Sequence, residues 1–474
     1  MGNLDGVTVS HSSDPDPVVP GLPPRARARE VRTGLSVLVV LTCGAYLPSP
    51  LYPAYQSAFA ISDLTMTLVY ATFALVSAPA LLLFGSASDA LGPRSVLRAS
   101  IGLAALGSAC FALAPGVAWL LAGRAAQGLA LGAATGAATA LISERARGLT
   151  RLDGAVLAST AFVAGTAAGP VAGGVLAEHA PAPRVLPFVV HLVLLGICWQ
   201  RVTHLADLAP RGRWRPTRPR IPRGTRLPFT AAAMTGALAW TVAGLFLAVI
   251  PALLARSGQR DQAVIGGILS AVLLCSVLTQ PLVPRLGTRR AQLTGLGALL
   301  VSLLLLAWTA GGSVPVTLLA AVVAGAGHGL AYGGSAAAVD AVAPAGERGA
   351  TTGALNLAFY LGAGLPAIAV GLVTLGRPLS TATSWVTAVA AALVPVACAV
   401  VVVSHRRRPR PTAPAGRRGG VPRLRSEPVP PEAPRPGARP EHTGRRSRRS
   451  PLAPAKRSGP GRRRAGADRP PARR

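Results

Sequence analysis

The chain alternates between long apolar stretches and short polar connections. About twelve stretches approach or exceed the roughly 20 residues that a helix needs to cross a bilayer. Most of them lack the polar face that helices of a soluble domain show. The pattern therefore predicts an all-α membrane protein with twelve transmembrane helices. The predicted spans are 34–54, 66–86, 96–115, 117–141, 153–177, 185–203, 229–254, 264–284, 292–311, 315–341, 350–375 and 381–403.

Composition supports this pattern. Of the 474 residues, 50% are hydrophobic and 14% are charged, whereas a soluble domain carries roughly 25% charged residues. The five cysteines stand singly in apolar spans, without the paired spacing of a metal site or a disulfide. We therefore expect no metal and no cofactor.

The net charge of +31 is concentrated on one side of the predicted membrane. With the N-terminus inside the cell, 43 of the 48 basic residues fall in inner loops, helix ends and tails, and four fall in outer loops. This asymmetry follows the positive-inside rule. It predicts a multi-pass protein of the cell (inner) membrane with both termini in the cytoplasm.

Polar, proline-rich stretches divide the chain into its expected domains. Residues 1–33 and 405–474 are predicted to be disordered cytoplasmic tails. A basic cytoplasmic linker, 204–228, separates a six-helix bundle at 34–203 from a second one at 229–404. We expect the Arg/Pro-rich C-terminal tail to lie near anionic headgroups of the lipid bilayer. It has no interleaved aromatic residues to stack on bases, so no nucleic acid is expected as a partner.

Three features recur at nearly constant spacing, which indicates an internal repeat. Leu-Gly-x-Arg occurs at 91–94 and at 286–289. The segment 127–132 is echoed at 328–333, and the Glu-Arg pair at 144–145 is echoed at 347–348. These offsets predict two pseudo-symmetric six-helix halves, the architecture of transporters that rock one bundle against the other around a midplane site.

Three motifs stand on successive spans. Gly85-Ser-Ala-Ser-Asp89-Ala-Leu-Gly92-Pro93-Arg94 follows the second span, and Arg124-Ala-Ala-Gln127-Gly128 lies in the fourth. The fifth carries Gly165-x-x-x-Gly169-Pro170-x-x-Gly173-Gly174. In this order they resemble the major facilitator superfamily, and the fifth-span motif resembles its drug–proton antiporter branches. The resemblance covers about residues 34–404 and implies the major facilitator fold.

The first motif is expected to act as a conformational gate made of Gly85, Asp89, Gly92 and Arg94. Glycine at 85 and 92 suits a tight loop that needs close packing and a positive φ angle. Asp89 would be attracted to a neighbouring helix N-terminus, which the resemblance places near residues 350–352. Arg94 would then brace it. An ordinary solvated charge is the alternative interpretation of Asp89.

Candidates for proton coupling are few. Arg124 lies inside a span, where burying a charge is costly and usually functional, and the resemblance implies a role in proton transfer; snorkelling to the outer surface is its alternative. His328 occupies the repeat position of Gln127 and can change charge near neutral pH, or it is a packing residue. Asp340 is the third candidate, near a cytoplasmic helix end.

The fifth-span glycines and Pro170 are expected to bend this helix and let its neighbours approach closely. The resemblance links the motif to export, although small residues also pack helices throughout membranes. In the same fold the first, fourth, seventh and tenth helices line the substrate path. The polar or aromatic members expected there, with two from the eleventh helix, are Tyr46, Tyr52, Gln127, Trp240, Phe246, Tyr332, Asn356 and Tyr360.

The expected function is secondary active transport, in which a hydrophobic or amphipathic small molecule leaves by alternating access against proton entry. The first span holds no carboxylate of the kind that many drug–proton antiporters use, so uptake by proton symport stays open. A non-transporting sensor that recruits partners through its basic tail is a third possibility. No nucleophile–base pair, metal cluster or phosphate loop points to an enzyme.

Overall fold

A computed structural model describes residues 22–149, 154–206, 214–216, 219–309, 311–344 and 348–406. The side chains of Asp89, Ala155, Arg223 and Arg348 are not described. Most of the two predicted tails, and part of the predicted linker, lie outside the described residues. The first helix begins at Pro24, so the end of the predicted N-terminal tail is helical. Proline suits this first helical turn, where its missing N–H is not needed.

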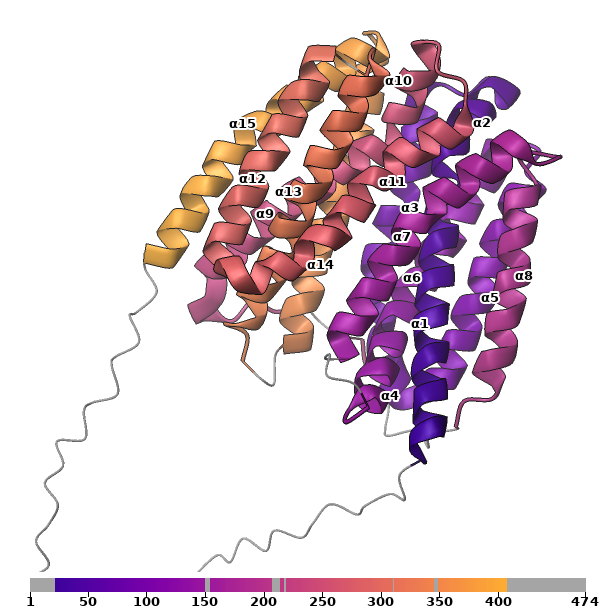
Figure 1. Ribbon diagram of the computed structural model, residues 1–474, viewed down its shortest axis with the longest axis vertical. Helices are drawn as coiled ribbons and strands as arrows, with labels where there is room; N and C mark the ends of the chain where they lie inside the picture. Colours follow the sequence, from indigo (N-terminus) through magenta and orange to yellow (C-terminus); the bar gives the residue numbers. More distant parts are fainter. Residues whose placement is uncertain are drawn as a thin grey trace, which may run out of the picture. The chain divides into compact units, whose positions relative to one another are not determined.

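The described residues form helices and contain no strand. The first half contains α1 (Pro24–Tyr46), η1 (Ser49–Leu51), α2 (Tyr52–Phe59), α3 (Asp63–Phe84), α4 (Ala87–Leu91), α5 (Pro93–Ala112), α6 (Val117–Ala146), α7 (Gly154–His179) and α8 (Leu186–Thr203). The second contains η2 (Arg223–Thr225), α9 (Arg226–Ala248), α10 (Ile250–Arg256), α11 (Gln262–Thr279), η3 (Gln280–Leu282), α12 (Val283–Thr309), α13 (Val314–Asp340), α14 (Arg348–Val373) and α15 (Leu379–Arg406) (Figure 1).

Eleven helical stretches of the described chain are long and apolar enough to cross a membrane. One of them, Gln262–Thr309, has 48 residues and contains both α11 and α12. Counted separately, these two helices bring the spans to twelve, as the hydrophobic pattern predicts. Large apolar side chains such as Trp308, Leu278 and Val193 are exposed on the helices, which suits helices that face lipid.

The ends of the helices define two faces. We call the side on which α1 begins and α15 ends the terminal face, and the opposite side, where α2 and α10 lie, the distal face (Figure 1). Because twelve spans alternate in direction, the α3–α4 connection lies at the terminal face, and the α7–α8 and α10–α11 connections lie at the distal face.

The repeat predicted from sequence is visible in the backbone. Gly92, before α5, has φ 77° and ψ 148°, and Gly287, at a kink in α12, has φ 75° and ψ 157°. Only glycine adopts such angles readily. Gly85, in contrast, has φ −56°, so the expectation of a positive φ at this position is wrong. A Cβ on Gly85 would instead meet the carbonyl of Leu81, and the close approach of α6 to this turn requires glycine at 136, where a Cβ would meet the Gly85 backbone.

Small residues bring equivalent helices together in each half. In the first, a Cβ on Gly128 or Gly132 of α6 would overlap the backbone of α3 near Ser77. In the second, a Cβ on Gly325 or Gly329 of α13 would overlap α11 near Ser276. Since lipid removes most of the hydrophobic force between helices, such backbone contact is what holds them.

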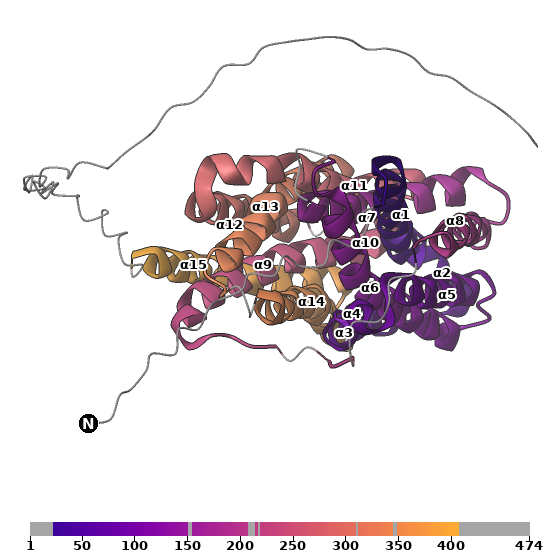
Figure 2. The same cartoon turned by 90° about the horizontal axis from the view of Figure 1, so that it is seen from below.

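Two seams join the halves, α7 beside α11 and α3 beside α14 (Figure 2). Both are tightest toward the distal face. On one, Gly174 lies against the backbone of Gln262 and Gly266; on the other, Gly371 lies against Thr67 and Leu64. The two halves are therefore packed together distally, which leaves the terminal face as the side where they can separate.

Candidate functional site

A cavity of about 670 Å³ lies between the two halves. Its lining includes the α3–α4 connection, the first turns of α14 and the end of α6 near Ser143, so it reaches the terminal face. Leu38 of α1 and Trp240 of α9, both near the middle of their helices, also line it. The volume falls within the range of small-molecule sites.

The two walls of the cavity differ in chemistry. The first half supplies hydroxyl groups, among them Thr135, Thr139 and Ser143 of α6 and Ser159 of α7. The second supplies most of the rings, one amide and the Thr352 hydroxyl, with the rings and amide coming from Trp240, Tyr332, Phe359, Tyr360 and Asn356, while Phe162 of α7 adds one ring to the first wall. None of the described side chains that line the cavity is charged.

Three of the four rings in the second wall form one connected cluster. Trp240 meets Tyr332 edge to face, with centroids 6.0 Å apart, and Tyr332 meets Phe359 at 5.2 Å. His328, one turn from Tyr332 on α13, stacks on it at 5.6 Å and contacts the edge of Trp240 at 5.0 Å. Edge-to-face and offset arrangements are the favoured ones for aromatic pairs. The cluster therefore fixes the Trp240 and Tyr332 rings at the cavity wall.

His328 is 1% exposed, and one of its nitrogens has no partner within the described part of the chain. Its Nδ1 lies 2.8 Å from the Ser276 hydroxyl, while Nε2 is buried and unpaired. His191, another histidine within a span, differs: Nδ1 lies 2.7 Å from Ser108, and Nε2 lies 3.0 Å from the Val40 carbonyl. Because a carbonyl only accepts, Nε2 of His191 is the donor. His191 is thus a satisfied packing residue, and His328 is not.

Arg124 is fully buried. Its Nη1 donates to the Ala45 carbonyl and, at 3.1 Å, to Oε1 of Gln127. The guanidinium lies over the rings of Phe73 at 4.5 Å and Tyr70 at 5.8 Å. Its Nε and Nη2 have no partner among the described residues. Arg124 does not snorkel to the surface; it remains a buried cation with donors to spare.

The sequence of α1 explains why Arg124 and Gln127 bind there. The carbonyl of Gly44 would accept from the N–H of residue 48 in a continuous helix, but Pro48 has none. Instead the Gln127 amide donates to it, at 3.1 Å. A broken helix end thus offers carbonyls, and the fourth span provides the donors that satisfy them.

The fifth-span glycines serve as contact points. Gly165 and Gly169 lie against α1, at Val39 and at Cys43, where an added Cβ would overlap the backbone. Gly173 faces Leu47, and Gly174 faces Gln262 across the seam. The carbonyl of Pro170 lies against Gly266 of α11. The motif therefore holds α7 to both the broken first span and the other half.

Polar contacts reinforce the distal closure between the halves. Arg256 Nη2 of α10 lies 2.7 Å from Oδ1 of Asp63, the first residue of α3. Glu178 of α7 accepts from the backbone N–H of Gln262 at 2.8 Å, and Ser270 of α11 donates to the Ala167 carbonyl at 2.7 Å. Sequence reasoning missed these pairs. The sequence offered one sign of them. Acidic residues are scarce on the predicted outer side, so each one there is a candidate for a contact between the halves.

The gate motif is only partly described. The side chain of Asp89 lies outside the described residues, and Arg94 is the second residue of α5, which begins at Pro93 directly after the left-handed Gly92. Nearby, the linker residue Trp214 stacks on Phe84 with centroids 5.6 Å apart and donates to the Leu83 carbonyl at 3.1 Å. Ser86 donates to the Arg215 carbonyl at 2.9 Å. This docking, at the cavity mouth, was not predicted.

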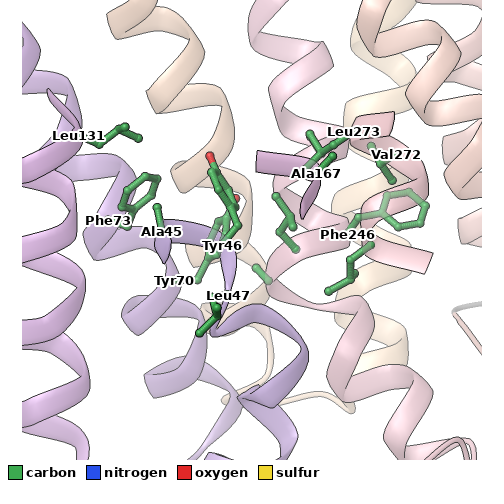
Figure 3. Close-up of a cluster of buried hydrophobic side chains, with 14 of the residues drawn as sticks. Ala45, Tyr46, Leu47, Tyr70, Phe73, Leu131, Ala167, Phe246, Val272 and Leu273 are labelled. Carbon is green, nitrogen blue, oxygen red and sulfur yellow. The ribbon is translucent and has the colours of Figure 1, made fainter. Parts of the chain in front are cut away.

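The residues expected along the path separate into two groups. Trp240, Tyr332, Asn356 and Tyr360 line the cavity. Tyr46, Tyr52, Gln127 and Phe246 do not; each is at most 3% exposed. Figure 3 shows Tyr46 and Phe73 from the first half and Phe246 and Leu273 from the second in one buried cluster. Asp340 ends α13 at the terminal face, where it is exposed.

The family model of the Major Facilitator Superfamily matches residues 35–367 and, in a second overlapping match, residues 233–458. The chain belongs to this family. It is therefore a membrane transporter and not an enzyme.

Similarity to individual proteins agrees with the family. The chain is 31% identical over 270 residues to the tetracycline resistance protein, class C, of Escherichia coli. The aligned region covers 53% of this chain and 66% of that relative, just under two thirds of its length.

Two solved structures share the fold. A bacterial homologue of the human lysosomal transporter Spinster, in an inward-facing and unoccupied conformation, has a TM-score of 0.63 at 14% identity over 81% of this chain and 98% of that one. A POT family transporter in complex with a thioalcohol-conjugated peptide has a TM-score of 0.66 at 12% identity, over 80% and 96% of the two chains.

Proposed function

We propose that this transporter exports a hydrophobic or amphipathic small molecule from the cell, coupled to proton entry. The observation that carries the proposal is the neutral, ring-lined cavity between the halves, which reaches one face while the opposite face is packed shut. A site with access to one side at a time is what alternating access requires. The efflux relative, named for tetracycline resistance, supports export of a drug-sized compound.

The charge distribution supports the proposed direction. Under the positive-inside rule, the basic tails and inner loops favour a terminal face in the cytoplasm, with the distal face outside the cell membrane. The described cavity is then open to the cytoplasm, ready to take up a substrate for export. The halves, 34–203 and 229–404, would rock about the buried cluster until the distal seams open and the gate at Asp89 and Arg94 closes the cytoplasmic side.

Coupling to protons rests on a short set of groups. Among the described residues α1 carries one carboxylate, Glu30, which is bound at 2.7 Å to Arg145 near the terminal face. The candidates are therefore Arg124, whose Nε and Nη2 are unpaired, His328, whose Nε2 is unpaired, and Asp340 at the cytoplasmic end of α13. We propose that protonation of His328 or Asp340 opposes substrate binding, with the charge of Arg124 acting on both.

Everted membrane vesicles test direction and coupling together. Their exposed surface is the cytoplasmic one, so an exporter accumulates substrate inside them, and antiport releases protons outward as it does so. We expect a panel of hydrophobic compounds to include one whose addition collapses part of an imposed pH gradient. Protons that cross the vesicle membrane in the same direction as the substrate would favour uptake by symport instead.

Deleting the C-terminal tail separates transport from recruitment. A variant that ends at Arg406, the last described residue of α15, should transport at the wild-type rate. A sensor or scaffold would give two different results. The full chain would show no transport, and removal of the tail would abolish the effect of the protein on the cell.

A further inference from the structure

Three buried side chains carry nitrogen atoms without a partner among the described residues: Trp240 in the cavity wall, and His328 and Arg124 outside its lining. Trp240 lines the cavity, yet its indole N–H is buried and has no partner among the described residues. Beside it, Nε2 of His328 is unpaired as well. Farther along, Nε and Nη2 of the buried Arg124 are also unpaired. Native proteins rarely leave buried polar groups unsatisfied, and such groups mark places that a ligand completes.

Nε2 of His328 is a donor in two forms of the ring. The Ser276 hydroxyl, 2.8 Å from Nδ1, can donate to it or accept from it. When Nδ1 accepts, a neutral imidazole carries its proton on Nε2. In the imidazolium form Nε2 is a donor too. In these two forms Trp240 and His328 each offer an N–H group that lacks an acceptor among the described residues.

The distribution of charged side chains also disfavours a cation as the ligand of the cavity. The acidic side chains that the structure describes stand at helix ends, such as Asp63 at the start of α3 and Glu178 at the end of α7. The fully buried Arg124 is held by one backbone carbonyl, one side-chain amide and ring faces, without a carboxylate among its described contacts. The ring faces of Trp240 and Tyr332 would attract a cation. However, a cation that enters the cavity from water meets no described carboxylate. The free energy that it loses on desolvation exceeds the free energy that one contact with a ring face supplies.

We propose that the cavity selects flat, ring-containing substrates that present acceptor oxygens to Trp240 and His328, and that it discriminates against cations. Carbonyl, phenolate or carboxylate oxygens satisfy the free N–H groups, while the substrate rings pack on Tyr332 and Phe359. The hydroxyl wall adds acceptors for substrate donors, since the Thr135 hydroxyl already donates to Leu131 and keeps its lone pairs free. This assignment rests on the proposed function, because it names the substrate class of the same cavity.

Binding to the purified full-length chain in lipid nanodiscs tests the proposal. Three fluorescent tricyclic probes of similar size differ in charge: acridone is neutral and has a carbonyl, acridone-4-carboxylate is an anion, and 9-aminoacridine is a cation at neutral pH. Fluorescence anisotropy should show acridone and its carboxylate binding at least about tenfold more tightly than 9-aminoacridine, a difference of about 1.4 kcal/mol.

Matched tryptophan variants locate the donor. Trp240→Phe keeps a ring and removes the N–H, so acridone affinity should fall about three- to tenfold while 9-aminoacridine is unaffected. Trp308→Phe, at a side chain that is 78% exposed on α12, should bind all three probes like the wild type. His328→Ala provides a second test of the same kind if Trp240→Phe does not fold.

Each outcome is decisive. Equal or tighter binding of 9-aminoacridine overturns the inference and leaves the proposed function intact, because a bound cation is still a ligand of the cavity. Unchanged acridone affinity in both Trp240→Phe and His328→Ala also overturns it. If none of the three probes binds, the inference fails. Failure of the proposed function appears separately, as absence of transport for the whole compound panel in everted vesicles.

Discussion

At the residue scale, one proline and one arginine determine how the carbonyl groups at the end of α1 are hydrogen-bonded. Pro48 leaves the Gly44 carbonyl without a helical donor, and Gln127 supplies the missing one. Arg124 binds the next carbonyl, of Ala45, and keeps two nitrogens unpaired. An unsatisfied buried group costs about 1–3 kcal/mol. The free nitrogens are therefore available to a substrate or to a group that exchanges protons.

Replacing Arg124 tests this role. In Arg124→Ala the Ala45 carbonyl loses its donor, at a cost of about 1–3 kcal/mol, and the buried charge disappears. Transport, measured per amount of protein in the membrane, should fall at least about tenfold, and sensitivity to a collapsed pH gradient should vanish. Arg260→Ala, in an exposed distal loop, is the control. Wild-type transport by Arg124→Ala would contradict the assignment.

Sequence alone singled out Arg124, because an arginine inside an apolar span is conspicuous whatever it contacts. It could not reveal that the partners are backbone carbonyls, since these have no signature in the sequence. His191 and His328 also look alike in sequence: each is a lone histidine in an apolar run. Only the three-dimensional contacts, two for His191 and one for His328, distinguish the packing residue from the free one.

At the element scale, α7 and α11 form the contact that keeps the distal side shut. The fifth-span motif predicted close packing, but its partner across the seam, Gly266, follows no motif in the sequence. There the carbonyl of Pro170 leaves no space for a side chain on α11. The eleventh span repeats the arrangement, since Gly362 faces Ala237 of α9 and Gly371 faces α3.

A methyl group on α11 should weaken this seam. Gly266→Ala places a Cβ against the Pro170 carbonyl, and overpacking of this kind costs about 1–3 kcal/mol. Cysteine accessibility at the distal ends of α7 and α11 should rise, since the state with the distal side shut loses population. Gly267→Ala is the matched control, because no atom lies within 4 Å of its added Cβ. Equal accessibility in the two variants would refute the role of the seam.

The linker contact is a second property of an element. Trp214 stacks on Phe84 and donates to the last turn of α3, so it ties the linker to the helix that precedes the gate motif. Trp214→Ala should slow transport two- to tenfold, since a stacked aromatic pair contributes about 0.5–1.5 kcal/mol. Trp214→Phe should retain most of the rate. If both variants transport like the wild type, the docking has no part in the cycle.

At the scale of the whole molecule, the hydrophobic pattern predicted the helices because lipid requires long apolar segments with satisfied backbones. The repeat offsets anticipated the paired left-handed Gly92 and Gly287. The lining of the cavity was harder to predict. Tyr46, Gln127 and Phe246 lie on helices that line the path, yet they are buried here because the distal half is closed. The sequence carries no sign of this burial, because it depends on which helices pack together at the distal face.

The ion pair between Asp63 and Arg256 links the halves at the distal face. Arg256 is 52% exposed at its side chain, and exposed pairs contribute at most about 1 kcal/mol. We therefore expect Asp63→Asn to shift distal accessibility by no more than about fivefold, and the charge-swapped double variant Asp63→Arg with Arg256→Asp to restore it. If distal accessibility in the double variant equals that in Asp63→Asn, the ion pair does not hold the distal side shut.

The central claim is that a small molecule crosses the membrane through the cavity between the halves. It is tested most directly by transport into proteoliposomes of the wild type and two tryptophan variants. Ala140→Trp fills the cavity, which Ala140 lines, and Leu106→Trp adds a similar ring at a side chain that is 55% exposed on α5. The account predicts that the wild type and Leu106→Trp accumulate substrate above empty liposomes and that Ala140→Trp does not. Wild-type accumulation by Ala140→Trp would contradict it.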